Sequence, residues 1–138
     1  MVCIHCRSET QVINSRLQKK ANQVWRRRKC TTCGAIFSSR EVAQYELIWL
    51  VRRRESLLPF NRDKLLLSIY TSCQHRPSAL SDARALTETV MSKLLFTAID
   101  GILEAPAIAQ TIQVALNRFD KAASVHFQAF HRTTSSRR

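Results

Sequence analysis

The sequence predicts an α+β protein in which a small N-terminal β module, residues 1–46, is followed by a mainly α-helical domain, residues 47–132. Four of the five cysteines lie within the first 33 residues, among short β-like stretches separated by polar breaks. The remainder is rich in Leu, Ile and Ala, and from residue 61 onward its apolar residues recur at helical spacing. Residues 133–138 are small, polar and basic, and we expect a disordered tail there.

The β module is expected to contain three strands, at residues 11–17, 23–29 and 35–42, with residues 19–22 as the turn between the first two. This segment holds few large apolar side chains, so it cannot build a sufficient hydrophobic core by itself. A bound metal is therefore a physical requirement for the folding of this module.

Two Cys-x-x-Cys pairs, Cys3 with Cys6 and Cys30 with Cys33, have the spacing of a structural zinc site. Each pair suits a tight turn, so that four thiolates can surround one tetrahedral Zn²⁺ at about 2.3 Å. Gly34 supplies the permissive backbone that such a turn needs after the second pair. The alternatives are a redox pair, which would need a βαβ frame that is not predicted here, and two disulfides; neither accounts for the doubled spacing. The sequence predicts one Zn²⁺ held by the four cysteines.

The chain carries 22 Lys and Arg against 10 Asp and Glu, a formal net charge of +12 that attracts polyanions. Its densest basic run precedes the second cysteine pair and contains no acidic residue. Strand alternation would send Trp25, Arg27 and Lys29 to one face and Arg26 and Arg28 to the other. A solvated surface is the alternative, but guanidinium groups fixed beside a zinc site suit phosphates and guanine edges. The predicted nucleic-acid contacts are Arg16, Arg26, Arg27, Arg28 and Lys29.

Capping residues and a proline place the elements of the second domain. A hydrophobic strand is expected at residues 46–51. Asn61, Ser81 and Asp120 are expected to be the N-caps of three helices, and Pro106 suits the first turn of another. The side chains expected in the core share an apolar helix face or an aromatic ring. They are Trp49, Leu65, Leu66, Ile69, Cys73, Ala83, Leu86, Val90, Leu94, Ile108, Ile112, Ala115, Leu116, Phe119, Ala123, Phe127 and Phe130.

A second basic cluster, residues 52–54, lies a few residues before the helix that begins after Asn61, and Lys64 falls in the first turn of that helix. A helix N-terminus beside Arg and Lys side chains is a ready anion site. The chain has only two glycines and no Walker-type loop, which excludes a P-loop. On these residues alone, a nucleotide site and a second DNA-facing patch both stay open.

Other classes of protein are not favoured. No secretory signal precedes Arg7 and no run of 18 apolar residues occurs, so we expect a cytoplasmic protein that does not bind to a membrane. Cys73 is expected to be a buried structural thiol, and the histidines show no spacing typical of a catalytic triad. We therefore do not expect an enzyme; an enzyme that uses the paired cysteines for thiol chemistry is the alternative.

These segments together resemble the NrdR-type bacterial repressors of ribonucleotide reductase genes, and the resemblance covers nearly the whole chain. In the first domain it rests on Cys3-x-x-Cys6, Val12-Ile13-Asn14-Ser15-Arg16, Arg26-Arg27-Arg28-Lys29-Cys30-x-x-Cys33 and Phe37-Ser38-Ser39. In the second it rests on Val51-Arg52-Arg53, Pro59-Phe60-Asn61-x-x-Lys64-Leu65, His75-Arg76-Pro77 and Phe119-Asp120-Lys121-x-Ala123.

The resemblance implies a zinc ribbon joined to an ATP-cone-like domain that contains a short β-hairpin. It implies a homo-oligomeric repressor that binds paired operator boxes in double-stranded DNA and is associated with the nucleoid. ATP and dATP would be the regulatory ligands that set its assembly state. The nucleotide contacts that the resemblance implies are Arg52, Arg53, Asn61, Lys64 and Arg76.

Several positions differ from the family pattern. In the first domain, Ile4 stands at the usual proline and Trp25 stands at the first arginine of the basic run. More of the differences fall in the second domain, for example Leu58 in place of an acidic residue, which favours a divergent member with an altered effector response. The competing function is an RNA-binding or polymerase-associated zinc ribbon whose helical domain docks a protein.

Overall fold

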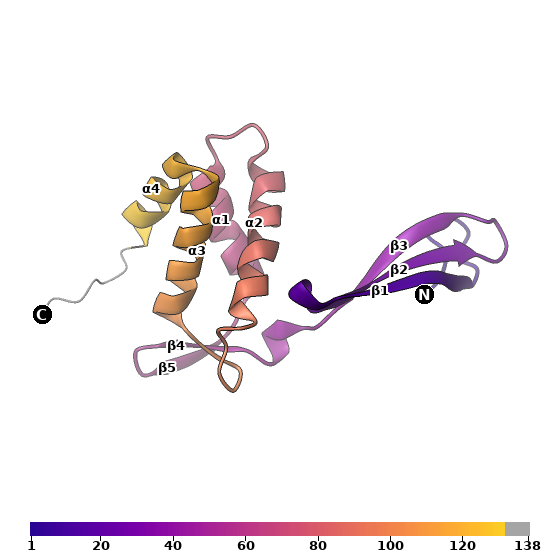
Figure 1. Ribbon diagram of the computed structural model, residues 1–138, viewed down its shortest axis with the longest axis horizontal. Helices are drawn as coiled ribbons and strands as arrows, with labels where there is room; N and C mark the ends of the chain where they lie inside the picture. Colours follow the sequence, from indigo (N-terminus) through magenta and orange to yellow (C-terminus); the bar gives the residue numbers. More distant parts are fainter. Residues whose placement is uncertain (132–138) are drawn as a thin grey trace, which may run out of the picture. The chain divides into compact units, whose positions relative to one another are not determined.

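The computed structural model describes residues 1–131 and divides the chain into two compact units, Met1–Ala43 and Gln44–Arg138 (Figure 1). This division lies slightly before the boundary predicted at residue 46. The α+β class is confirmed, since the first unit is built of strands and the described part of the second holds four helices and a small sheet. The tail predicted at residues 133–138 lies outside the described residues.

The first unit is a three-stranded antiparallel sheet in the order β1-β2-β3. Its strands are β1 (Thr10–Gln18), β2 (Gln23–Cys30) and β3 (Ile36–Val42), so the three predicted strands are confirmed. The predicted turn is a short 3-10 helix, Lys19–Ala21, that ends at Asn22 with a positive φ of 46°. In this unit, all of which is described, the buried side chains are Cys3, Gln23 and Cys30. The sheet therefore has almost no hydrophobic core of its own.

A second three-stranded sheet, in the order β5-β4-β6, belongs to the other unit. Strands β4 (Leu50–Arg53) and β5 (Ser56–Pro59) form an antiparallel hairpin, and β6 (Ile102–Glu104) pairs with β4 in parallel. The hairpin predicted from the family resemblance is thus present. Its turn is made by Arg54, whose φ is +56°, and Glu55.

The strand predicted at residues 46–51 is wrong in its first half. Residues Tyr45–Leu47 form a 3-10 helix instead, and strand β4 begins only at Leu50. The Trp49 N–H donates a hydrogen bond of 2.7 Å to the Tyr45 carbonyl oxygen, and the Tyr45 and Trp49 rings pack with centroids 4.3 Å apart. Burial of Trp49 in the core folds this turn back, overriding the local preference for a strand.

Up to residue 131, four helices complete the second unit. Asn61 caps the first by accepting the Lys64 N–H at 2.8 Å, and Asp120 caps the last by accepting two backbone N–H groups, as predicted. Pro106 lies in the first turn of the third helix, also as predicted. The helices are α1 (Arg62–Cys73), α2 (Ala79–Leu94), α3 (Ala105–Phe119) and α4 (Lys121–Phe130).

The N-cap predicted at Ser81 is wrong, because α2 already begins at Ala79 after an N-cap at Ser78. The Ser78 hydroxyl does not cap the helix backbone. It donates instead to the Asp82 carboxylate at 2.7 Å, a side-chain contact that secures the first turn.

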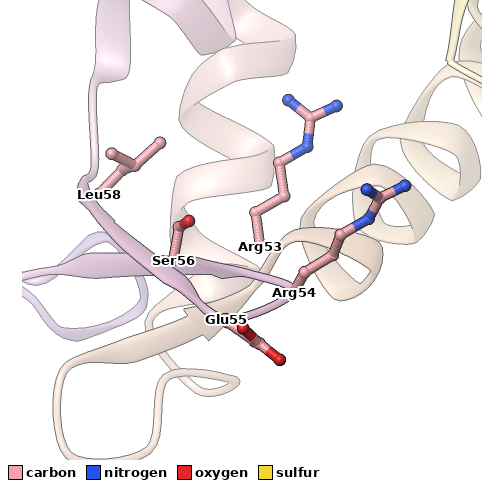
Figure 2. Close-up of a pocket in the computed structure, with 5 residues that line it drawn as sticks. All are labelled: Arg53, Arg54, Glu55, Ser56 and Leu58. Carbon is pink, nitrogen blue, oxygen red and sulfur yellow. The ribbon is translucent and has the colours of Figure 1, made fainter.

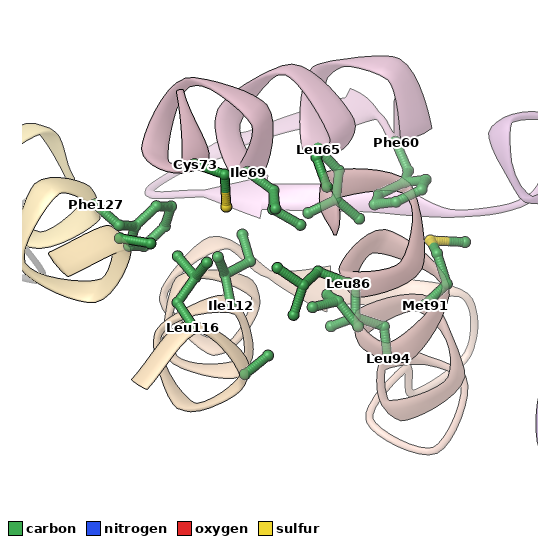
Figure 3. Close-up of a cluster of buried hydrophobic side chains, with 14 of the residues drawn as sticks. Phe60, Leu65, Ile69, Cys73, Leu86, Met91, Leu94, Ile112, Leu116 and Phe127 are labelled. Atoms are coloured by element: carbon green, nitrogen blue, oxygen red, sulfur yellow. The ribbon is translucent and has the colours of Figure 1, made fainter. Parts of the chain in front are cut away.

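The helices and β4 enclose one hydrophobic core, part of which is drawn in Figure 3. Most predicted core residues are confirmed, including Ile69, Leu94, Leu116 and Phe127, which are almost fully buried. Cys73 is buried among them, as expected of a structural thiol. Two aromatic assignments are wrong: Phe119 is 40% exposed and Phe130 is 72% exposed. Each ends a helix, where few neighbours remain to cover its ring. None of the described helices is long and apolar enough to cross a membrane.

Candidate metal centre and nucleic-acid interface

The four predicted metal ligands come together at one end of the first unit. The Sγ atoms of Cys3, Cys6, Cys30 and Cys33 all lie within 4.8 Å of one another. The Cys3–Cys33 distance is 3.7 Å and the Cys6–Cys30 distance is 3.4 Å. Four sulfurs placed tetrahedrally at 2.3 Å from a zinc ion would be about 3.8 Å apart, so this spacing fits one ion. All four are free cysteines rather than disulfides.

Backbone N–H groups turn toward one sulfur of each pair. The His5 N–H donates to Cys3 Sγ at 3.4 Å, and the N–H groups of Thr32 and Cys33 donate to Cys30 Sγ at the same distance. Such bonds favour a thiolate over a thiol, because they stabilise its negative charge. The positive φ of Gly34, +72°, completes the second turn as the sequence predicted.

The pKa values of Cys6 and Cys33 reflect local hydrogen bonds and the close packing of the thiols. Hydrogen bonds from the side chain and backbone of Ser8 lower the pKa of Cys6 to about 6. The Ala35 N–H acts in the same direction on Cys33, but the neighbouring thiols, Cys6 and Cys30, outweigh it and raise the pKa of Cys33 to about 12. Four clustered thiolates repel one another, and a bound dication relieves that repulsion. The donor set is therefore suited to one zinc ion.

The basic residues of β2 lie on two different faces of the sheet. Strand β2 pairs with both neighbours, and residues opposite one another share a face. Arg27 and Lys29 lie on the face that also carries Trp25, and both are exposed. Arg16 is paired directly with Trp25, so it lies on that face as well. These positions agree with the alternation predicted from the sequence.

Arg26 and Arg28 lie on the opposite face and are only partly exposed. Arg26 Nη1 forms an ion pair of 2.7 Å with Glu41, and Arg28 Nε donates a hydrogen bond of 3.0 Å to Ser39. Both partners belong to β3. The five predicted nucleic-acid contacts are thus divided between a face that carries Arg16, Arg27 and Lys29 and a face on which the two arginines already have partners. Sequence reasoning missed Arg40, which the register places opposite Trp25. The signal that could have found it is the alternation of side chains along β3.

In the second unit, the β4–β5 hairpin borders an open pocket of about 520 Å³ (Figure 2). The pocket is lined by Arg53, Arg54, Glu55, Ser56 and Leu58. Figure 2 shows the side chains of Arg53 and Arg54 extended on the same side of the hairpin, while Glu55 points away. Arg53 was a predicted nucleotide contact; Arg54 belongs to the same basic run but was not proposed. Two guanidinium groups in one pocket suit a phosphorylated ligand.

The other predicted nucleotide contacts are not gathered at this pocket. Arg52 pairs with Glu104 of β6 at 2.9 Å, and strand alternation places it on the other side of β4 from Arg53. Asn61 and Lys64 lie at the N-terminus of α1, which follows the far end of β5. The Asn61 side chain is occupied as the helix cap, whereas Lys64 is exposed.

Arg76 lies beyond the C-terminus of α1, about 18 Å along the helix from its start. Its guanidinium contacts Asp82 at 2.7 Å and Asp120 at 3.0 Å, and it packs over the Phe119 ring, 4.7 Å from the centroid. Arg76 therefore joins three segments of the helical unit and is remote from the hairpin pocket.

Comparison with known proteins agrees with the geometry of the ribbon. Residues 1–41 match the N-terminal domain described as "Transcriptional repressor NrdR-like". A protein of Symbiobacterium thermophilum named "Transcriptional repressor NrdR" is 30% identical over 132 residues, which cover 96% of this chain and 87% of that protein. The chain belongs to the NrdR family of transcriptional repressors.

Two further NrdR proteins show a similar relation to this chain. The repressor of Nitrosomonas eutropha is 28% identical over 134 residues, covering 96% of this chain and 83% of its own length. That of Syntrophotalea carbinolica is 29% identical over 133 residues, covering 96% and 84% respectively. The resemblance to NrdR noted from short segments is therefore confirmed over both units. Proteins of this name are repressors and not enzymes, which agrees with the class predicted from the sequence.

Proposed function

We propose that this chain is a cytoplasmic, nucleoid-associated bacterial repressor that binds operator DNA of ribonucleotide reductase genes through its four-cysteine zinc ribbon. Its oligomeric state and DNA affinity would be controlled by ATP and dATP. Family membership supports the repressor function, and the observation that supports DNA as the ligand is the exposed basic face held beside the cysteine cluster.

The basic residues that would bind DNA are carried by a hydrogen-bonded sheet. Arg16, Arg27 and Lys29 are carried by adjacent strands of one sheet, so little backbone or loop ordering is needed when they meet a row of phosphates. The last residue of β2, Cys30, belongs to the cysteine cluster. Zinc binding therefore fixes the strand that carries the basic residues.

Regulation by nucleotides is supported by the hairpin pocket. Arg53 and Arg54 offer two guanidinium groups to a triphosphate, whereas the exposed Lys64, at the start of α1, does not line the pocket. Arg52 and Arg76 already bind carboxylates of the chain, so we assign the main phosphate contacts to Arg53 and Arg54.

The DNA part of the proposal is tested by binding of the zinc-loaded protein to promoter fragments of ribonucleotide reductase genes. We expect tight binding to duplexes with two half-sites separated by an integral number of helical turns, and weaker binding when half a turn is inserted between them. A protein that bound single-stranded RNA equally well, with no dependence on half-site spacing, would instead be the RNA-binding or polymerase-associated ribbon that competes with this function.

The nucleotide part is tested by calorimetric titration of ATP and dATP, with light scattering to follow oligomer size. Double substitution of Arg53 and Arg54 with Ala should abolish the heat of binding and the change in size. Exposed Arg84 on α2 provides the matched control, since Arg84→Ala removes a cation far from the hairpin in sequence. Absence of binding heat and of any size change in the unmodified protein would contradict nucleotide control while leaving DNA binding untouched.

A further inference from the structure

The register of the three strands of the ribbon aligns a row of residues on one face of the sheet. Arg16 of β1, Trp25 of β2 and Arg40 of β3 are direct cross-strand partners, so their side chains lie side by side on one face. The two arginines are exposed and the indole is partly exposed between them. We call the face that carries Arg16, Trp25, Arg27, Lys29 and Arg40 the tryptophan face.

The charges of the two faces differ. At the paired positions of this sheet, all of them within the described part of the chain, the tryptophan face carries four cations and no carboxylate. The remaining side chains there are polar or apolar, among them Asn14 beside Arg27 and Ser38 on the other side. The opposite face carries Arg26 and Arg28 together with the carboxylate of Glu41. Unpaired positive charge is therefore concentrated on the tryptophan face.

The dimensions of the row suit a groove of duplex DNA. Neighbouring strands are about 4.8 Å apart, so the backbones that carry Arg16 and Arg40 are separated by about 10 Å. The major groove is about 12 Å wide and admits a two-stranded β-ribbon, so the face of this three-stranded sheet spans the groove from wall to wall. Two arginines at this separation can reach the phosphates on its two walls, while the residue between them faces the bases. That residue is Trp25, whose indole offers an apolar surface to the sugar or to a thymine methyl group.

We propose that the tryptophan face is the surface that enters the DNA groove, with Arg16 and Arg40 on opposite phosphate walls and Trp25 between them. Arg26 and Arg28 lie on the opposite face, where their contacts with Glu41 and Ser39 join β2 to β3. The inference rests on the proposed DNA binding and specifies which surface of the ribbon performs it.

Salt dependence separates the roles of these residues. Each lost phosphate contact lowers the log-log slope of affinity against salt by about 0.9, whereas loss of an apolar contact leaves the slope unchanged. Arg40→Ala should therefore lower the slope by about 0.9. Trp25→Ala should reduce affinity several-fold at every salt concentration with the slope intact, and Trp25→Arg should steepen it because a cation is added.

The experiment uses the full zinc-loaded protein and a fluorescein-labelled duplex of mixed sequence, titrated over a series of KCl concentrations. Arg26→Ala is the matched substitution on the opposite face and should leave the slope near that of the unmodified protein. Zinc content and thermal unfolding confirm that each variant is folded. Trp25 fluorescence, obtained by subtracting the signal of Trp25→Phe, should change on DNA binding.

Three outcomes would overturn the assignment. A slope lowered by Arg26→Ala but not by Arg40→Ala would place DNA on the opposite face and leave the proposed function standing. Equal losses from both substitutions would show that the ribbon contacts DNA with both faces. Failure of the unmodified protein to bind duplex at low salt would overturn the proposed function and this inference together.

Discussion

Arg76 Nη1 donates a hydrogen bond of 3.0 Å to Asp120 Oδ2, and this contact joins the loop after α1 to the N-terminus of α4. The other oxygen of the same carboxylate accepts the N–H groups of Ala122 and Ala123. Arg76 also reaches Asp82 in the first turn of α2. One guanidinium thus secures the starts of two helices.

Replacement of Arg76 by Ala should lower the melting temperature of the helical unit by several degrees. The substitution leaves the partly exposed Asp82 and Asp120 side by side without their common counter-charge. Arg76→Lys should restore only part of the loss, since one ammonium cannot copy the planar contact to both carboxylates. Thermal unfolding followed by circular dichroism measures the effect, with exposed Arg84→Ala as control. A melting temperature equal to that of the unmodified protein would show that the cluster contributes no stability.

The same cluster predicts a dependence of stability on acid. The Ala123 N–H, with His75 and Arg76, holds the pKa of Asp120 well below its usual range, and Arg76 lowers the pKa of Asp82. Groups with a depressed pKa in the folded state contribute stability above their unfolded pKa of ~3.9, and lose it as the pH falls toward the folded value.

The melting temperature should therefore fall progressively below about pH 4. Asp120→Asn should flatten that fall, because the amide no longer titrates. An identical acid profile in this variant would assign the effect to other carboxylates.

Chelation of zinc should unfold the ribbon and spare the helical unit. The first unit has almost no hydrophobic core, so metal binding supplies most of its folding free energy. Trp25 lies in this unit and Trp49 is buried in the other, so the two indoles report separately. With EDTA, the emission of Trp25 should shift to the red while that of Trp49 stays constant, each isolated by a Trp→Phe substitution at the other site. A persistent Trp25 signal after complete metal removal would show a ribbon that folds unaided.

Two residues of α1 give a matched test of the core. Ile69 is fully buried and Leu67 is 61% exposed on the same helix. Ile69→Ala should cost about 2–5 kcal/mol of unfolding free energy, because it leaves a cavity among packed side chains. Leu67→Ala removes similar volume and should cost less than about 0.5 kcal/mol. Urea unfolding measures both, and comparable losses would mean that Leu67 is covered in solution, for example by another copy of the chain.

Local chemistry made much of the fold predictable. Asn61 and Asp120 cap helices as expected because each is followed by a free N–H that its side chain can reach within one turn. The cysteine spacing predicted the cluster, since a Cys-x-x-Cys turn needs only local geometry to direct both sulfurs to one side. The basic face followed from alternation along β2, which has no irregularity in its register with β3.

Some predictions were wrong, and some predicted sites have residues that lie apart in the structure. These cases depend on contacts between distant segments. The turn at Tyr45 forms because Trp49 is buried by the helical core, which no local pattern reveals. The nucleotide candidates were grouped by their nearness in sequence and by resemblance, and only the register of β4 with β6 shows that Arg52 faces Glu104 while Arg53 faces the pocket. Phe130 continues the apolar stripe of α4 beyond the point where the core ends, so its position on the helix did not predict burial.

The pairing of β2 with both of its neighbours limits how the length of this chain can vary. Unless a β-bulge absorbed it, as happens at Ile13 of β1, an inserted or deleted residue between Gln23 and Cys30 would exchange the two sides of the strand, so that Arg26 and Arg28 took the place of Trp25 and Arg27. The 3-10 turn at Lys19–Ala21 lies outside the register and can absorb an added residue without this exchange. Length variation in the ribbon is therefore most easily tolerated at its turn, while the two-residue period of the strand constrains the interval from Trp25 to Cys30.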